Sequence, residues 1–249
     1  LVNGNTKLKG DAVIGEDSSD LLVVNSGSTF MNNLDINGKH KYYAGDVVKT
    51  FADNNGSLSS VFVSGDFLFM GTGGTTAKMW DISTGNFVKT FNHGANVRSV
   101  FVSGDYLFTG GVDTTAKMWD ISTGNFVKTF NHGNAVFSVF VSGDFLFTGS
   151  YDRTAKMWDI STGNFVRDFT GHGNLVSSVF VSGDYLFTGS YDDAAKMWNI
   201  STGNLVKTFT DHSGDVRSVF VSGDYLFTGS YDDTAKMWAI NDIKLGLNA

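Results

Sequence analysis

The chain of 249 residues contains no cysteine, so disulfide bonds, a cysteine nucleophile and thiolate metal sites are all excluded. The absence of cysteine is compatible with either an oxidising or a reducing compartment. The sequence also lacks an apolar run of about 18 residues, so no helix is predicted to span a bilayer. Glutamate is nearly absent, because Glu16 is the only one, and the net charge of −7 comes almost wholly from aspartate. Such a chain lacks the basic face needed for nonspecific binding to nucleic acids or anionic membranes.

The sequence does contain an internal repeat. Its five tryptophans stand at positions 80, 119, 158, 198 and 238, at intervals of 39, 39, 40 and 40 residues. The residues before each tryptophan recur almost letter for letter. A fixed period of this size is typical of a repeat architecture.

Each repeat unit reads as four short strands. Ser-Val-Phe-Val-Ser, Tyr-Leu-Phe-Thr-Gly-Ser, Thr-Ala-Lys-Met-Trp-Asp-Ile and Phe-Val-Lys-Thr-Phe are rich in β-branched and aromatic residues. Turn-forming clusters such as Ser-Gly-Asp and Ser-Thr-Gly-Asn separate them. The pattern predicts an all-β chain of four-stranded antiparallel sheets. Because each sheet is apolar on both faces, we expect the sheets to stack on one another around an axis, as in a β-propeller.

Several residues of the repeat match a known family. The first three tryptophans begin a Trp-Asp dipeptide, whereas Asn199 and Ala239 follow the last two. Gly171 and His172 form a Gly-His pair, and an aspartate stands six residues before each of the last four tryptophans. Residues from about 46 to 240 therefore resemble the WD-repeat β-propellers. The resemblance implies a propeller fold.

The order of strands predicts how the propeller closes. Residues 47–51, Val-Val-Lys-Thr-Phe, match the fourth strand of a unit, and the fifth unit lacks this strand. We therefore expect residues 46–249 to form five four-stranded blades, with residues 47–51 completing the sheet of Trp238 and removing its open edge. Two alternatives stay open. Residues 20–45 could supply a degenerate sixth blade, or several chains could share blades or N-terminal strands.

Residues 1–45 lack tryptophan and the repeat, and are predicted to form a β-rich N-terminal extension. Residues 1 to about 40 loosely resemble the short β-repeats of phage and viral tail-fibre shafts, in which strands wrap between chains. The alternatives are an ordered extension and a decayed blade. Two-stranded segments are marginal alone, so we expect this extension to need a partner surface and to be fibre-like or oligomerising.

Four units carry a hydroxyl, an imidazole and a carboxylate that suggest nucleophilic catalysis. In the fourth unit these are Thr188 or Ser190, His172 and Asp192. The family resemblance implies instead a buried structural relay that ends on the tryptophan indole, and four copies suit a loop clamp better than an active site. The first unit has lost it, with Asn54 near the histidine position and Gly74 at the aspartate position. The predicted relay residues are His93, Asp113, Trp119, His132, Asp152, Trp158, His172, Asp192, Trp198, His212, Asp232 and Trp238.

A partner-binding face is predicted where otherwise matched units differ. The variable positions lie in the loop before the first strand and in the turn between the second and third strands, which open onto one face of a propeller. Tyrosine and arginine are favoured at contact hot spots. The residues of this face are Arg98, Phe137, Tyr151, Tyr191, Arg217 and Tyr231. No loop has the ligand spacing of a calcium site. The sequence also has no phosphate loop, no metal-ligand cluster and no unique acid-base pair, so we predict no metal, cofactor or catalytic residue.

These patterns favour a non-enzymatic structural or interaction protein, a propeller head with an assembly segment in an extracellular or virion appendage. The alternatives are an intracellular WD-repeat scaffold that docks protein or peptide partners, and a propeller lectin whose equivalent pockets give avidity. The expected partners are proteins, reached by self-assembly or by docking, with carbohydrate left open. Nucleic acid and membrane insertion are not expected. The extracellular or virion surface is favoured over the cytoplasm.

Overall fold

The computed structural model describes residues 34–36, 39–41, 47–52 and 56–240. The contacts within the chain divide it into two units, Leu1–Thr50 and Phe51–Ala249. In the first unit, β1 (Leu34–Ile36) and β2 (Lys39–Lys41) form an antiparallel hairpin. The other predictions for the N-terminal extension, including the tail-fibre-like repeats, lie outside the described residues.

The second unit consists of antiparallel sheets in which strands adjacent in sequence are adjacent in space. The first strands are β3 (Leu58–Ser64), β7 (Val97–Ser103), β11 (Val136–Ser142), β15 (Val176–Ser182) and β19 (Val216–Ser222). The second strands are β4 (Phe67–Thr72), β8 (Tyr106–Gly111), β12 (Phe145–Ser150), β16 (Tyr185–Ser190) and β20 (Tyr225–Ser230). The third strands are β5 (Thr76–Asp81), β9 (Thr115–Asp120), β13 (Thr154–Asp159), β17 (Ala195–Asn199) and β21 (Ala235–Ala239). The fourth strands are β6 (Phe87–Asn92), β10 (Phe126–Asn131), β14 (Phe165–Thr170) and β18 (Leu205–Phe209).

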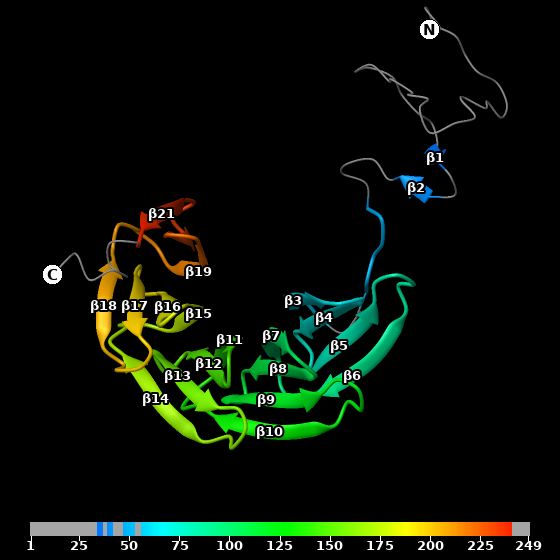
Figure 1. The fold of residues 1–249 in the computed structure, drawn as a ribbon, viewed down its shortest axis with the longest axis horizontal. Helices are drawn as coiled ribbons and strands as arrows, with labels where there is room; N and C mark the ends of the chain where they lie inside the picture. The colour runs from blue at the N-terminus through cyan, green and yellow to red at the C-terminus, as the bar shows by residue number, and fades with distance from the viewer. Residues whose placement is uncertain (1–33, 37–38, 42–46, 53–55, 241–249) are drawn as a thin grey trace, which may run out of the picture. The chain divides into compact units, whose positions relative to one another are not determined.

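These strands form sheets I (β3–β6), II (β7–β10), III (β11–β14), IV (β15–β18) and V (β19–β21), which follow one another along the second unit (Figure 1). The prediction of an all-β chain of repeated antiparallel sheets is confirmed. The turn between the first and second strands needs a left-handed backbone, which glycine adopts without strain. In sheet IV this residue is Gly183, with φ of 56°.

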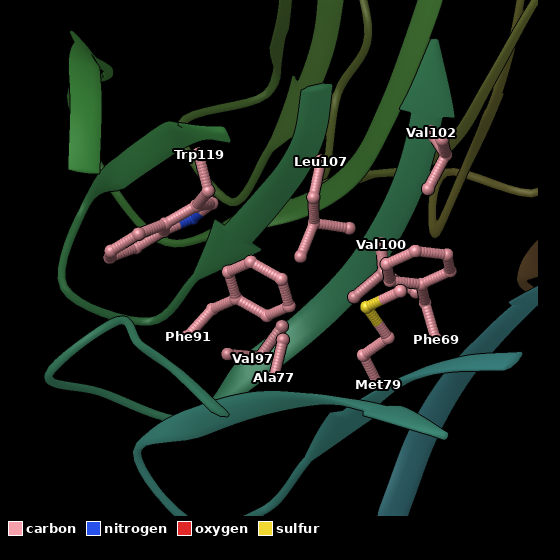
Figure 2. Close-up of a cluster of buried hydrophobic side chains, with 9 residues drawn as sticks. All are labelled: Phe69, Ala77, Met79, Phe91, Val97, Val100, Val102, Leu107 and Trp119. Atoms are coloured by element: carbon pink, nitrogen blue, oxygen red, sulfur yellow. The ribbon is translucent and has the colours of Figure 1, made fainter. Parts of the chain in front are cut away.

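Neighbouring sheets cover each other through a repeated interface. Sheet I contributes Phe69 and Met79 to the first such core, and sheet II packs Val100 and Leu107 against them (Figure 2). Equivalent side chains form the cores between sheets II and III, III and IV, and IV and V. A hydrogen bond accompanies this packing, because the Val100 N–H donates to Ser60 Oγ of the preceding sheet at 3.1 Å. Each interior sheet is therefore stabilised by a neighbour on either side.

The structure does not show the predicted closure of the ring. Sheet V has three strands, and residues 47–51 lie in no strand. Among the residues that the structure describes, the sheet of Trp238 therefore lacks the fourth strand that these residues were expected to supply. Phe51 packs edge-on against Trp80 of sheet I, while Met237 on β21 is 62% exposed.

Candidate functional site

The predicted relay of the fourth unit is brought together at one end of sheet IV. His172 lies in the loop before β15, and its Nδ1 is 2.9 Å from Asp192 Oδ2, in the turn after β16. Its Nε2 is 2.7 Å from Thr188 Oγ1. The indole N–H of Trp198 on β17 donates to the same hydroxyl oxygen at 2.9 Å. The structure thus selects Thr188 as the hydroxyl, while Ser190 donates to the Asn174 carbonyl.

One proton arrangement satisfies every atom of this chain. Thr188 Oγ1 accepts from the Trp198 N–H, so its own proton is available to His172 Nε2. In this arrangement the imidazole carries a proton on Nδ1, from which it donates to Asp192. The Gly173 N–H also donates to Asp192, at 2.7 Å. The carboxylate therefore ties the loop before the first strand to the turn between the second and third strands.

The relay varies between units. In sheet V, His212 bridges Asp232 and Thr228 as His172 does in sheet IV, and Trp238 donates to Thr228. In sheet II the imidazole is turned over, with His93 Nε2 on Asp113, Nδ1 on Thr109 and the Trp119 N–H on the same hydroxyl. In sheet III, His132 Nδ1 contacts Asp152 and Trp158 donates to Thr148.

Two buried polar atoms at the histidine and tryptophan positions of the repeat have no hydrogen-bond partner among the described residues. His132 Nε2 makes no hydrogen bond, so the relay of sheet III is interrupted between its histidine and its threonine. In sheet I the threonine is replaced by Met70, and Trp80 Nε1 is unpaired. Gly74 stands at the aspartate position of that unit. The predicted position of Asn54 lies outside the described residues.

The relay carboxylates are held in their charged form. Burial by itself would raise the pKa of Asp192, but hydrogen bonds from His172 and the Gly173 N–H lower it to about 2. The pKa of Asp113 is likewise lowered to about 2, because hydrogen bonds from Lys117 and Thr115 outweigh its burial. Burial lowers the pKa of His93. Near neutral pH the carboxylates of Asp192 and Asp113 are therefore charged. The imidazole of His93, which contacts Asp113, is neutral.

Three residues of the predicted partner face lie at β-bulges in the first strands. In each first strand the register shifts across one residue, for example between Val216 and Ser218, so the residue between them is extra. Bulges redirect side chains away from the regular ladder and are frequent at functional sites. The bulged residues include three of the predicted face residues, Arg98, Phe137 and Arg217.

Two clusters of cations and aromatic rings form on this face. The Arg217 guanidinium carbon lies 4.3 Å from the ring centroid of Tyr191 and 5.0 Å from that of Tyr231, so it links sheets IV and V. Asp215 accepts from Arg217 Nη2 at 3.1 Å. In the second cluster, Arg98 lies 5.7 Å from the ring centroid of Phe137.

Tyr151 belongs to the second cluster, since its ring centroid is 6.3 Å from that of Phe137. The backbone holds each tyrosine turn against the loop before the first strand. The Tyr191 N–H donates to the Leu175 carbonyl at 3.1 Å, and the Tyr151 N–H donates to the Ala135 carbonyl at 2.9 Å. The six predicted residues therefore fall into two groups of three, each spanning two sheets.

Four consecutive segments of the chain match the family model described as WD40, WD domain, G-beta repeat, at residues 85–120, 124–159, 163–199 and 203–239. The chain belongs to the WD40 repeat family. Each matched segment begins beside the fourth strand of one sheet and ends with the third strand of the next.

One solved structure supports the fold of this WD40 chain. It is the crystal structure of a computationally designed protein, Ika8, which is 22% identical over 74% of this chain and 71% of the designed chain, with a TM-score of 0.61. A likeness at this identity shows the fold alone. Comparison with curated proteins gives no match.

The WD40 sheets also form clefts that the sequence did not single out. Three equivalent clefts lie between sheets I and II, II and III, and III and IV, with volumes of about 230, 350 and 570 Å³. The largest is lined by Phe145, Met157, Arg167 and Asp184, among others. The signal that could have found them is the recurrence of Ser-Gly-Asp beside an aromatic residue in every unit.

Neither metal clusters nor membrane helices are found in the part of the WD40 chain that the structure describes. No three histidine, aspartate or glutamate side chains there gather as metal ligands. No helix in the same residues is long and apolar enough to cross a membrane.

Proposed function

We propose that this WD40 chain is a non-enzymatic scaffold that docks a protein partner on the face of its bulged residues. The observation that carries the proposal is the Tyr191–Arg217–Tyr231 cluster. WD40 repeats indicate a protein-interaction scaffold, and this cluster gives the interaction a definite place on the chain.

The cluster has the properties of a contact hot spot. Tyr231 is 73% exposed, so its ring is accessible to a partner, and Tyr191 is half-buried. Arg217 is fixed between two rings and by Asp215, so little side-chain freedom remains to be lost on binding. Its charge is already compensated by that carboxylate. The face therefore suits a protein segment that lays an apolar side chain against the tyrosine rings and hydrogen-bonds their hydroxyls.

The relay supports a structural role for the four histidines. Thr188 and His172 are buried, and their hydrogen bonds are used inside the protein. The same arrangement stands beside the docking face in the neighbouring sheet V. We infer that the relays hold the loops of the docking face in place and carry out no reaction.

The test uses peptides selected from a random displayed library on the purified full chain. Binding of the selected peptides is then measured to a Tyr191→Ala/Arg217→Ala double variant and to a Val166→Ala control, which changes an outer strand of sheet III. We expect the double variant to lose about tenfold or more in affinity and the control to bind normally. Peptides that bind the wild type and the double variant equally would count against this face.

The clefts between sheets favour a second candidate function, carbohydrate binding. Each is lined by an aromatic residue and a carboxylate, as by Phe145 and Asp184 in the largest cleft and by Tyr106 and Asp144 in the next. Aromatic faces suit the apolar side of a sugar ring, and repeated sites would add avidity. A glycan array tests it, with a Phe145→Ala/Tyr106→Ala variant as the comparison. Binding that this variant loses supports the lectin function, and an array without binding contradicts it.

A further inference from the structure

The first and last sheets of the second unit expose the faces that all other sheets bury. Val61 on β3 is 61% exposed, whereas the equivalent Val100 on β7 is 4% exposed because it packs on sheet I. At the other end, Met237 on β21 is 62% exposed, whereas the equivalent Met197 on β17 is fully buried against sheet V. Each end thus presents one half of an interface that the molecule forms four times.

Phe51 packs on sheet I where the phenylalanine of a preceding sheet would pack. In each complete interface, a phenylalanine of a fourth strand meets the tryptophan of the following sheet edge-on or tilted. The ring centroids of Phe91 and Trp119 are 6.2 Å apart, and those of Phe169 and Trp198 are 6.1 Å apart. Phe51 meets Trp80 in the same way, at 6.1 Å and an interplanar angle of 72°. Phe51 therefore holds the position of the phenylalanine of a fourth strand, and residues 47–51 match such a strand in sequence.

We propose that sheet V of a second copy of this chain supplies that sheet. In this contact β21 of the second copy pairs with residues 47–51, and its Met237 and Phe227 cover Val61 and Val63 of sheet I. The geometry is known from the four existing interfaces, since Met79 and Phe69 cover Val100 and Val102 in the same manner (Figure 2). The surface that covers sheet I is thus expected to be another sheet of the same repeat, namely sheet V of the second copy.

A second copy fits this contact better than the chain's own sheet V. The phenylalanines at the centre of the first strands form a ladder, with ring centroids 4.8, 4.8, 4.9 and 5.0 Å apart from Phe62 to Phe220. Rings at this spacing are already in contact, so the turn between sheets cannot increase without breaking the ladder. A second copy repeats the existing step unchanged. Because the contact is head-to-tail, it continues into a ring of chains or an open filament.

The test is the mass of the purified full chain in solution, measured by light scattering over a dilution series. Val61→Asp blocks one end, and Met237→Asp blocks the other. Both side chains are exposed, so neither change disturbs the interior of a single chain. Val127→Asp, on an outer strand of sheet II, adds the same charge away from both ends and serves as the control.

We expect the wild type and the Val127→Asp control to exceed the single-chain mass of 26.9 kDa, and to dissociate on dilution. Each end variant alone should have the single-chain mass. An equimolar mixture of the two should give twice that mass, because each retains one intact and complementary end. A wild type that is a single chain at every concentration would overturn the proposal. So would end variants that still assemble alone, which would indicate another contact surface, or a mixture that does not combine.

Discussion

The indole N–H of Trp198 donates to Thr188 Oγ1 at 2.9 Å, and the equivalent N–H of Trp80 has no partner among the described residues because Met70 replaces the threonine. The chain therefore holds the same indole with and without its acceptor. The repeat supplies matched comparisons of this kind at several positions, and the experiments below use them.

Replacing Thr188 with valine should destabilise the protein. Valine has nearly the same shape but leaves the Trp198 N–H and His172 Nε2 buried without partners. We expect the free energy of unfolding to fall by about 1–3 kcal/mol, measured by thermal unfolding. Thr170→Val is the control, since Thr170 is exposed at the end of β14. Similar losses in the two variants would argue against the relay as a stabilising element.

Asp192→Ala should lower the melting temperature more than Gly74→Ala. The first change removes the acceptor of His172 and of the Gly173 N–H, whereas the second falls in the unit without a relay. Calorimetry of both variants measures the difference. Equal melting temperatures would mean that Asp192 does not clamp the two loops.

Acid should destabilise the chain through the same carboxylates. The pKa values of Asp113 and Asp192 are lowered from 3.8 to about 2, so the unfolded chain binds protons first as the pH falls. Their contribution is complete above pH 3.8 and is lost between that pH and about 2. The melting temperature of Asp192→Asn should fall less steeply across this range than that of the wild type. Parallel curves would contradict the shift at Asp192.

Thr114→Gly should stabilise the chain. Thr114 has φ of 71°, a left-handed conformation that is unfavourable for a β-branched residue. We expect a gain of about 0.5–1 kcal/mol in the free energy of unfolding, because the relieved strain exceeds the greater freedom of glycine in the unfolded chain. Thr75 is the matched position of the first unit and does not share the positive φ. Thr75→Gly should therefore destabilise, and a gain there as large as at Thr114 would refute the explanation.

Much of the fold could be predicted from the sequence because short local patterns determine the strands and turns of each unit. Turn residues and alternating apolar residues define four strands in each unit, and the resemblance to WD-repeat propellers implied that His172, Asp192 and Trp198 form a relay. The choice between Thr188 and Ser190 needed coordinates, since both lie on β16. The stacking of Arg217 between two tyrosines depends on a β-bulge. It could not be predicted, because the bulge does not change the spacing of the strands in the sequence.

Closure could not be predicted for a different reason. It depends on the turn between neighbouring sheets, accumulated over every interface, and small differences in packing decide whether the ends meet. Residues 47–51 match a fourth strand in sequence, but they lie in no strand. The structure places Phe51 on sheet I as that match implies, but no described residue pairs with the outer edge of β21.

The most direct test compares the same valine in a covered and an uncovered sheet, since the central claim is that neighbouring sheets stabilise each other. Val139 of sheet III is buried against sheet II, and Val61 of sheet I is exposed. At a concentration where the chain is single, Val139→Ala should lower the free energy of unfolding by about 2–3 kcal/mol, while Val61→Ala should change it by less than about 0.5 kcal/mol. Equal losses at the two positions would contradict the claim.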